Sequence, residues 1–122
     1  MLSQTEMLEL LEELSEELPA EFFEELNGGV VLQEEAKEHP RGEGDLWIMG
    51  EYCKGGNMGN YINIYYGSFV KLYGSCSREE IKKKLRHTLR HEFRHHLESR
   101  AGEKDLEILD AIYLEAYRKS RP

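Results

Sequence analysis

The sequence predicts an α+β fold with N-terminal helices, a small mainly antiparallel sheet, a long helix and a C-terminal helix. Apolar residues recur at three- and four-residue intervals toward both ends of the chain, which is typical of amphipathic helices. Aromatic and β-branched runs separated by glycine-rich loops occupy the middle, which indicates strands. A length of 122 residues suffices for one hydrophobic core, so we expect a single domain over residues 1–122.

The N-terminal segment is expected to be helical. Leucines and a methionine recur at helical spacing over residues 2–18, with glutamates between them. Ser3 followed by Glu6 has the form of a capping box at the start of this helix. Pro19 interrupts the pattern, and a short second helix over residues 20–26 is expected to end at a pair of glycines.

The middle of the chain is expected to form the sheet. Residues 30–32 are a short apolar run, and residues 46–52 and 61–66 are aromatic and β-branched runs. Glycines and asparagines between the last two runs suit a hairpin loop. Residues 69–73 could extend the sheet or turn beneath it.

A second capping box, Ser77 with Glu80, precedes the long helix. Its apolar residues follow at four-residue steps and form one stripe: Ile81, Leu85, Leu89, Phe93 and Leu97. Gly102 is expected to end or bend this helix. Asp105 can then cap a last helix whose apolar pattern continues to Ala116.

The long helix carries the five residues His91-Glu92-Phe93-Arg94-His95, an H-E-x-x-H. Residues four apart on a helix share a face and lie about 6 Å apart along the axis, so two imidazoles can bind one Zn²⁺. The glutamate then stands close enough to take a proton from a zinc-bound water. The pattern therefore predicts His91 and His95 as zinc ligands and Glu92 as the general base of a peptide hydrolase.

The third zinc ligand is an open question in this sequence, because catalytic zinc usually takes three protein ligands. Glu98 shares the face of the two histidines but lies about 10 Å along the axis from the first of them. Asp105 follows a glycine at which the chain can turn back toward the histidines, and it is favoured as the ligand. Glu103 and Glu107 flank it and stay as alternatives.

The remaining histidines are given other roles. His87 lies one turn before His91, but Thr88 would then occupy the position of the general base, so we interpret His87 as a solvated helix residue. His96 falls toward the apolar side of the helix and is expected to lie in the core or to support the ligands. His39 lies in an expected loop and is interpreted as a surface residue.

Three stretches of the chain resemble one known family. They are LPAEFFEELNGGVVL, YINIYYGSF and TLRHEFRHHLESRAGEKDLE, and the family is that of the minimal zincin-like metallopeptidases, predicted Zn-dependent proteases of bacteria. The family's commoner site pattern, H-E-x-x-H-H-x-G-x-x-D, is matched at His91, Glu92, His95 and His96, whereas the G-x-x-D ending in Asp105 comes four residues late. The resemblance implies a zincin-like fold, zinc-dependent peptide hydrolysis and Asp105 as a zinc ligand.

The charge distribution is uneven along the chain. Residues 1–45 are strongly acidic, and residues 77–100 are mostly basic. We interpret these segments as two solvated helix faces that attract each other, the alternative being an acidic docking surface for a basic partner.

Composition excludes several classes of partner. The formal net charge of −8 argues against nucleic acid and anionic membrane as general partners. No apolar run reaches the length of a membrane span, and the acidic N-terminus is unlike a signal peptide. Cys53 and Cys76 have no close spacing and are expected to be reduced thiols. We therefore expect a cytoplasmic protein.

Two functions are compatible with these features. The first is a zinc-dependent metallopeptidase that acts on a peptide or protein substrate. The alternative is a non-catalytic module on the same scaffold that binds metal or another protein. A closed site with four protein ligands, or the absence of bound metal after zinc supplementation, would favour the alternative. No pattern indicates an oligomeric state or a group that stabilises the oxyanion.

Overall fold

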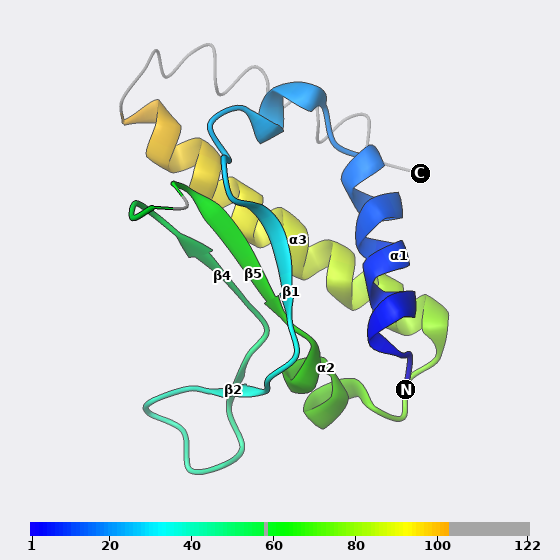
Figure 1. Ribbon diagram of the computed structural model, residues 1–122. Helices are drawn as coiled ribbons and strands as arrows, with labels where there is room; N and C mark the ends of the chain where they lie inside the picture. Colours follow the sequence, from blue (N-terminus) through cyan, green and yellow to red (C-terminus); the bar gives the residue numbers. More distant parts are fainter. Residues whose placement is uncertain (58, 103–122) are drawn as a thin grey trace.

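The computed structural model describes residues 1–57 and 59–102, and it confirms the α+β class (Figure 1). Its helices and strands follow in this order: α1 (Gln4–Glu16), the 3-10 helix η1 (Ala20–Phe23), β1 (Gly29–Gln33), β2 (Lys37–Glu38), β3 (Trp47–Ile48), β4 (Gly50–Cys53), β5 (Tyr61–Tyr65), α2 (Tyr66–Tyr73) and α3 (Arg78–Ala101). No helix within the described residues is long and apolar enough to cross a membrane.

The main sheet is mixed rather than mainly antiparallel. Its strand order is β1-β5-β4, with β1 parallel and β4 antiparallel to the central β5. The chain leaves the end of β1, forms the small antiparallel pair β2–β3, and returns through β4 before it enters β5. Strand β5 thus lies between β4 and β1 and is parallel to its neighbour β1, whereas a succession of hairpins would make only antiparallel neighbours.

Helix α3 crosses one face of the sheet, and α1 lies beside α3 (Figure 1). The core lies where these three elements meet. It contains Met7, Leu10 and Leu14 of α1, Ile62 and Ile64 of β5, and Leu85, Leu89, Phe93 and Leu97 of α3. The four-residue stripe of α3 is thus buried as its spacing predicts, so the opposite margin of the helix is left to polar side chains.

Both long helices begin at the predicted capping boxes. The Ser3 hydroxyl accepts from the Glu6 N–H and the Glu6 carboxylate accepts from the Ser3 N–H, and Ser77 and Glu80 repeat this exchange at the start of α3. Each box satisfies two backbone donors that the first turn of a helix leaves unpaired. The start of α3 is therefore fixed, which in turn fixes which of its residues face the sheet.

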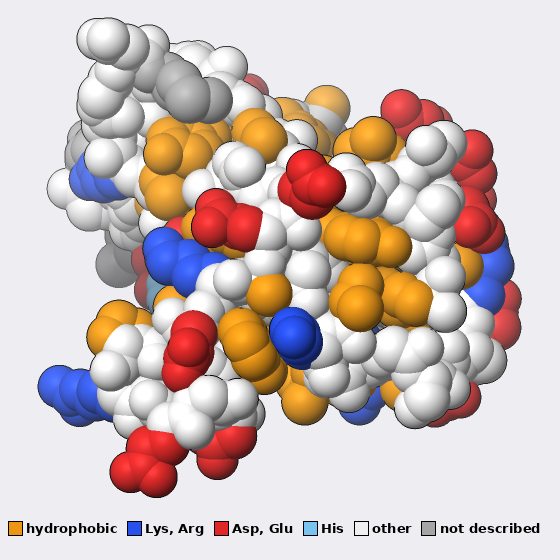
Figure 2. Space-filling view, turned by 60° about the horizontal axis from the view of Figure 1, so that its bottom comes forward, with side chains coloured by type: hydrophobic (Ala, Val, Ile, Leu, Met, Phe, Trp, Pro, Cys, Tyr) orange, Lys and Arg blue, Asp and Glu red, His pale blue; other side chains and the backbone are white. Residues whose placement is uncertain are grey.

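Ion pairs join α1 to α3 and confirm that the acidic and basic segments attract each other. Glu13 lies 3.0 Å from the Lys82 ammonium, and the Glu17 carboxylate accepts two hydrogen bonds from the Arg86 guanidinium at 2.9 and 3.0 Å. Arg90 is also within 3.5 Å of Glu17. Figure 2 shows acidic side chains next to Lys or Arg side chains along one margin of the molecule.

Two expected elements differ from the structure. The strand expected over residues 46–52 is divided into β3 and β4 at Met49, whose carbonyl accepts a hydrogen bond from the Tyr65 N–H at 3.0 Å. Residues 69–73, expected to extend the sheet or turn beneath it, belong to helix α2. At its start Gly67 packs so closely that a Cβ atom there would lie 2.4 Å from the Ala36 amide nitrogen, so only glycine fits at this position.

The ends of the predicted helices are also adjusted. The second N-terminal helix is a single 3-10 turn over Ala20–Phe23 rather than a helix over residues 20–26. Gly102 is the C-cap of α3, as expected. The C-terminal helix expected after Asp105 lies outside the described residues.

Candidate metal and active site

His91 and His95 lie on the exposed face of α3, and their side chains converge. Their Nε2 atoms are 3.1 Å apart, the ring centroids are 4.7 Å apart and the ring planes are nearly perpendicular, at 88°. One turn of α-helix separates the two residues, so this proximity follows from the spacing itself. Both imidazoles therefore offer the same ring nitrogen to one point in space.

Glu92 lies on the buried side of this pair. Only 6% of its surface is exposed, because the side chain packs against β4. Its carboxylate accepts a hydrogen bond from the backbone N–H of Tyr52. Burial raises the pKa of the Glu92 carboxyl above the ordinary value of 4.5, while His91, His95 and the Tyr52 N–H act in the opposite direction.

Gly50 makes the close approach of β4 to α3 possible. A Cβ atom at Gly50 would lie 3.0 Å from the Thr88 methyl carbon, 3.2 Å from the Asn63 carbonyl oxygen and 3.3 Å from Glu92 Cγ. Any larger residue would have to displace at least one of these neighbours. The glycine therefore sets the distance between the strand and the helix that carries Glu92.

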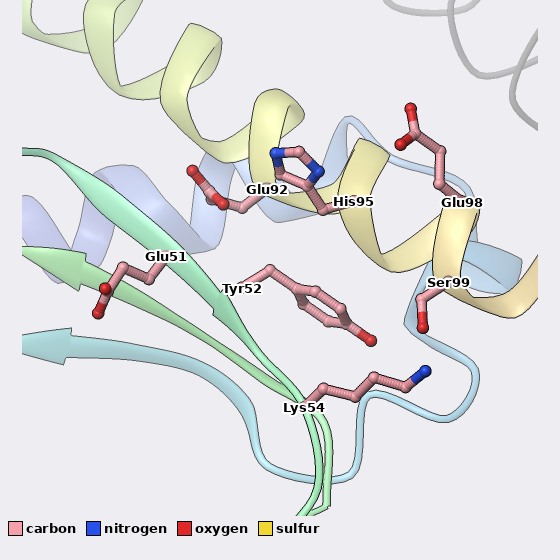
Figure 3. Close-up of a pocket in the computed structure, with 7 residues that line it drawn as sticks. All are labelled: Glu51, Tyr52, Lys54, Glu92, His95, Glu98 and Ser99. Carbon is pink, nitrogen blue, oxygen red and sulfur yellow. The ribbon is translucent and has the colours of Figure 1, made fainter.

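An open cleft lies between β4 and α3 beside these residues. Its volume is about 640 Å³, and it is lined by Glu51, Tyr52 and Lys54 from the strand and by Glu92, His95, Glu98 and Ser99 from the helix. In Figure 3 Tyr52 extends from β4 beneath α3, with Glu92 and His95 toward one end and Lys54 and Ser99 toward the other. The cleft is large enough for a few residues of an extended peptide.

His96 lies behind the cleft in the core, as the apolar side of the helix predicts. It is fully buried, and its Nδ1 and Nε2 lie 2.9 Å from the Tyr52 hydroxyl and 2.8 Å from the Glu24 carbonyl oxygen. Burial lowers the pKa of the His96 imidazole, so the ring is neutral near pH 7. Its two nitrogens are both occupied by protein partners, which excludes it as a metal ligand in this arrangement.

The described residues contain no third ligand next to His91 and His95. Among residues 1–57 and 59–102, no group of three His, Cys, Asp or Glu side chains is arranged to hold a metal ion. Glu98 lines the cleft but accepts a hydrogen bond from Arg94 at 2.9 Å instead of joining the histidines. Asp105, the favoured ligand, and the alternatives Glu103 and Glu107 lie outside the described residues.

The other histidines lie apart from the site. His87 lines a separate hollow with Tyr73, Lys83 and Lys84, on the part of α3 that precedes the motif. The Nδ1 atom of His39 accepts the Arg41 N–H at 3.1 Å, a contact within its own loop. Both observations agree with the non-ligand roles that the sequence suggested.

Tyr52 and Gly50 are site residues that the sequence did not reveal. Tyr52 supplies the backbone N–H that donates to Glu92 and the hydroxyl that contacts His96. Gly50 has no side chain and so allows Glu92 to pack against β4. Both depend on the packing of β4 against α3. The only signal in the sequence was the glycine interrupting an otherwise apolar and aromatic run, which often marks a close backbone approach.

Comparisons with known proteins give one informative relationship. A solved structure described as a conserved hypothetical protein from Thermo thermophilus is 37% identical in sequence and superposes with a TM-score of 0.74. The match covers 84% of this chain and 100% of the other. No protein-family model matches the chain, and no curated protein matches it.

These findings correct the resemblance to the minimal zincin-like metallopeptidases, which is wrong as a family assignment. The matching structure is named only as a conserved hypothetical protein, and no family model of any kind matches. The described part of the chain also lacks a three-residue metal group. The resemblance rested on three short stretches, and its site pattern H-E-x-x-H-H is itself short: it needs only two histidines four residues apart and a third on the buried side of the same helix.

Proposed function

Because the chain belongs to the same family as the conserved hypothetical protein from Thermo thermophilus, whose name states no activity, we propose its function from the site itself: zinc-dependent hydrolysis of peptide bonds. One observation carries the proposal. Two imidazole Nε2 atoms lie 3.1 Å apart, directly beside a buried carboxylate with a raised pKa. Convergent ligand atoms next to a perturbed acid–base group are the usual composition of a hydrolytic metal site.

The two histidines fit zinc chemically and geometrically. Zinc binds imidazole nitrogen at about 2.0–2.1 Å, so two tetrahedral ligands lie roughly 3.3–3.4 Å apart. The observed separation of 3.1 Å requires only a small rotation of either ring to reach that value. At this separation one Nε2 can donate a hydrogen bond to the other, depending on the tautomers, whereas zinc binding would need both nitrogens without a proton.

Zinc, when bound, would lower the pKa of its water and polarise a carbonyl oxygen. Glu92 is placed to accept the proton of the attacking water and to deliver it to the leaving amine. The raised pKa of its carboxyl brings the group nearer to neutral pH, where a general base and acid is most effective. The Glu92 carboxylate accepts a hydrogen bond from the Tyr52 N–H, and the residue lines the cleft.

The outer edge of β4 is the proposed binding surface for substrate. Within the described sheet β4 is an edge strand, and its side chains form one wall of the cleft. An extended peptide can add to such an edge through backbone hydrogen bonds. The cleft is open and combines polar with apolar surface, which suits an extended peptide better than a compact apolar ligand.

Asp105 is proposed as the third ligand, with Glu103 and Glu107 as alternatives. Gly102 ends α3 one residue after Ala101, so the chain can change direction close to the histidines. Asp105→Asn should reduce zinc affinity about 10-fold or more, since one of three protein ligands is lost. Equal zinc affinities for this variant and the wild type, with a loss in Glu103→Gln or Glu107→Gln, would reassign the ligand.

The central experiment separates metal binding from chemistry. Purified protein is dialysed against zinc, its metal content is measured, and hydrolysis of a mixed peptide library is followed by mass spectrometry. Glu92→Gln should keep one zinc per chain and lose at least about 100-fold in turnover, because only the proton acceptor is removed. Turnover by Glu92→Gln equal to that of the wild type would remove Glu92 from the mechanism.

The alternative is a non-catalytic module that binds metal or protein. It is favoured by the lack of a third ligand among residues 1–57 and 59–102. A wild-type protein that binds zinc but cleaves no library peptide would support it. A cytoplasmic location and a single domain over residues 1–122 belong with the proposal as expectations from the sequence.

A further inference from the structure

We propose that Tyr52 and His96 act together as positioning residues that hold the Glu92 carboxylate on strand β4. The inference rests on the proposed role of Glu92 as general base. It concerns how that base is held in place, and its test is designed so that it can succeed even if the protein cleaves no peptide.

The hydrogen bonds of His96 fix which nitrogen carries its proton. The Glu24 carbonyl oxygen, 2.8 Å from Nε2, can only accept a hydrogen bond, so Nε2 must be protonated. The neutral ring then has a bare Nδ1, which accepts from the Tyr52 hydroxyl at 2.9 Å. Tyr52 is therefore the donor in this contact, and its ring has one preferred orientation.

Tyr52 is attached to α3 at two points. Its hydroxyl binds His96, and its backbone N–H binds the Glu92 carboxylate. Glu92 and His96 are four residues apart, so they lie one above the other on the same side of the helix. The two contacts therefore clamp one residue of an edge strand across one helical turn, and the N–H cannot drift from the carboxylate without breaking the hydroxyl contact.

The segment that accepts the hydrogen bond from His96 Nε2 is itself held by Arg100. Arg100, one turn later in α3 and only 3% exposed, donates to the Glu21 carbonyl oxygen at 3.0 Å and to the Glu24 carboxylate at 2.9 Å. It also donates to Glu25, which has a positive φ of 65° and is held in that conformation by its surroundings. The Glu24 carbonyl is thus fixed in place, and so is the histidine that donates to it.

Hydrogen exchange of the Tyr52 amide tests the proposal directly. The Tyr52 N–H points away from β5, because the Tyr65 N–H to Met49 carbonyl bond and the strand register make Tyr52 and Ile62 a non-hydrogen-bonded pair; its exchange therefore reports on the bond to Glu92. Tyr52→Phe removes the hydroxyl and keeps the amide. We expect its exchange to accelerate roughly three- to tenfold, the weight of one hydrogen bond, while the amides of β5 keep their protection.

Two variants of His96 each keep one of its two hydrogen bonds and remove the other. Asn places an amide oxygen near the position of Nδ1, so His96→Asn keeps an acceptor for Tyr52; Gln places an amide nitrogen near Nε2, so His96→Gln keeps the bond to Glu24. His96→Gln should accelerate exchange of the Tyr52 amide as Tyr52→Phe does, and His96→Asn should accelerate it less. Tyr66→Phe is the matched control, because it removes a hydroxyl bond to the Leu2 carbonyl at a distance from Glu92.

The outcomes are separable. Unchanged exchange of the Tyr52 amide in Tyr52→Phe would overturn the proposal, because the hydroxyl contact would then not hold the amide on Glu92. Equal acceleration of all amides in β4 and β5 would also overturn it, because the contact would then stabilise the sheet in general. If the wild type hydrolyses peptides, Tyr52→Phe should lower kcat about three- to tenfold and leave KM unchanged, because only the base is displaced. Should the wild type prove inactive, the exchange results still decide whether the pair holds Glu92.

Discussion

The Nε2 atoms of His91 and His95 lie 3.1 Å apart in a helix that is capped at its start and buried along its apolar stripe. The pair is therefore oriented before any further ligand joins it. Little conformational entropy remains to be lost when these two side chains bind a cation, which favours binding. This relationship leads to the first prediction.

His91→Ala and His95→Ala should each abolish stoichiometric zinc binding, whereas His87→Ala should leave it intact. His87 is a matched control because it is the same residue type, one turn earlier on the same helix. Each ligand loss should cost about 10–100-fold or more in affinity, as ligand-shell changes do. Zinc affinity is measured by the metal content after dialysis and by competition with a coloured chelator. A loss of affinity in His87→Ala equal to that in the other two variants would contradict the assignment of His91 and His95 as the ligands.

Glu92→Gln should stabilise the metal-free protein at neutral pH. The pKa of Glu92 is raised by burial above the 4.5 of the unfolded chain, so the folded protein binds more protons between these values and loses stability as pH rises through that window. The side-chain amide of glutamine carries no charge to bury, and its oxygen can still accept a hydrogen bond from the Tyr52 N–H. We expect a gain of about 0.5–2 kcal/mol at pH 7.

Urea unfolding of the chelator-treated proteins at pH 4 and pH 7 measures this difference. The gain of Glu92→Gln over the wild type should shrink at pH 4, below the unfolded pKa, where the wild-type carboxyl is protonated in both states. A gain that is equal at both pH values would show that ionisation of Glu92 is not its source.

Gly50→Ala should destabilise the domain and impair the site together. Its Cβ would lie 3.0 Å from the Thr88 methyl carbon and 3.3 Å from Glu92 Cγ, so these side chains must shift by a few tenths of an ångström. A cost of about 1–3 kcal/mol is expected for such overpacking. Thr88→Ser removes that methyl group and should recover part of the loss, which a double-mutant cycle in urea measures. Strictly additive effects would place the strain elsewhere.

Glu17→Gln should weaken the contact of α1 with α3 and reduce the acid sensitivity of the protein. The Arg86 hydrogen bonds hold the pKa of the Glu17 carboxyl below 4.5, so their stabilisation is present above pH 4.5 and is lost as pH falls through the folded value. The pair is about one-third exposed, which limits the cost to about 0.2–1 kcal/mol. Unfolding measured from pH 3 to 7 checks this, with the neighbouring exposed Glu16→Gln as control.

The two long helices, α1 and α3, could be predicted from the sequence because their signals are local. The capping boxes at Ser3 and Ser77 and the four-residue stripe of α3 each lie within a few turns of one helix, and the structure has them as predicted. The position of His96 in the core follows from the same periodicity. For these helices the apolar face that the sequence predicts is the face that is buried in the folded protein.

The sheet could not be predicted to the same extent, because its pairing is long-range. The parallel register that joins Gly29 to Tyr61 depends on how the intervening chain folds back, and no local pattern encodes it. Residues 69–73 have strand-like composition, yet they belong to helix α2, which begins where Gly67 packs closely on Ala36. The contacts of Glu92 with β4 could not be predicted either, because they join residues that are far apart in the sequence.

The motif therefore divides into a part that belongs to one helix and a part that belongs to the whole domain. The contact between His91 and His95 lies within one turn of α3, whereas the buried setting of Glu92 depends on β4, which pairs with β5 and packs on α3. Helices form faster than sheets of high contact order. On the proposed function, folding would bring these two ligands together before it completed the setting of the base, so a partly folded chain would lack hydrolytic activity.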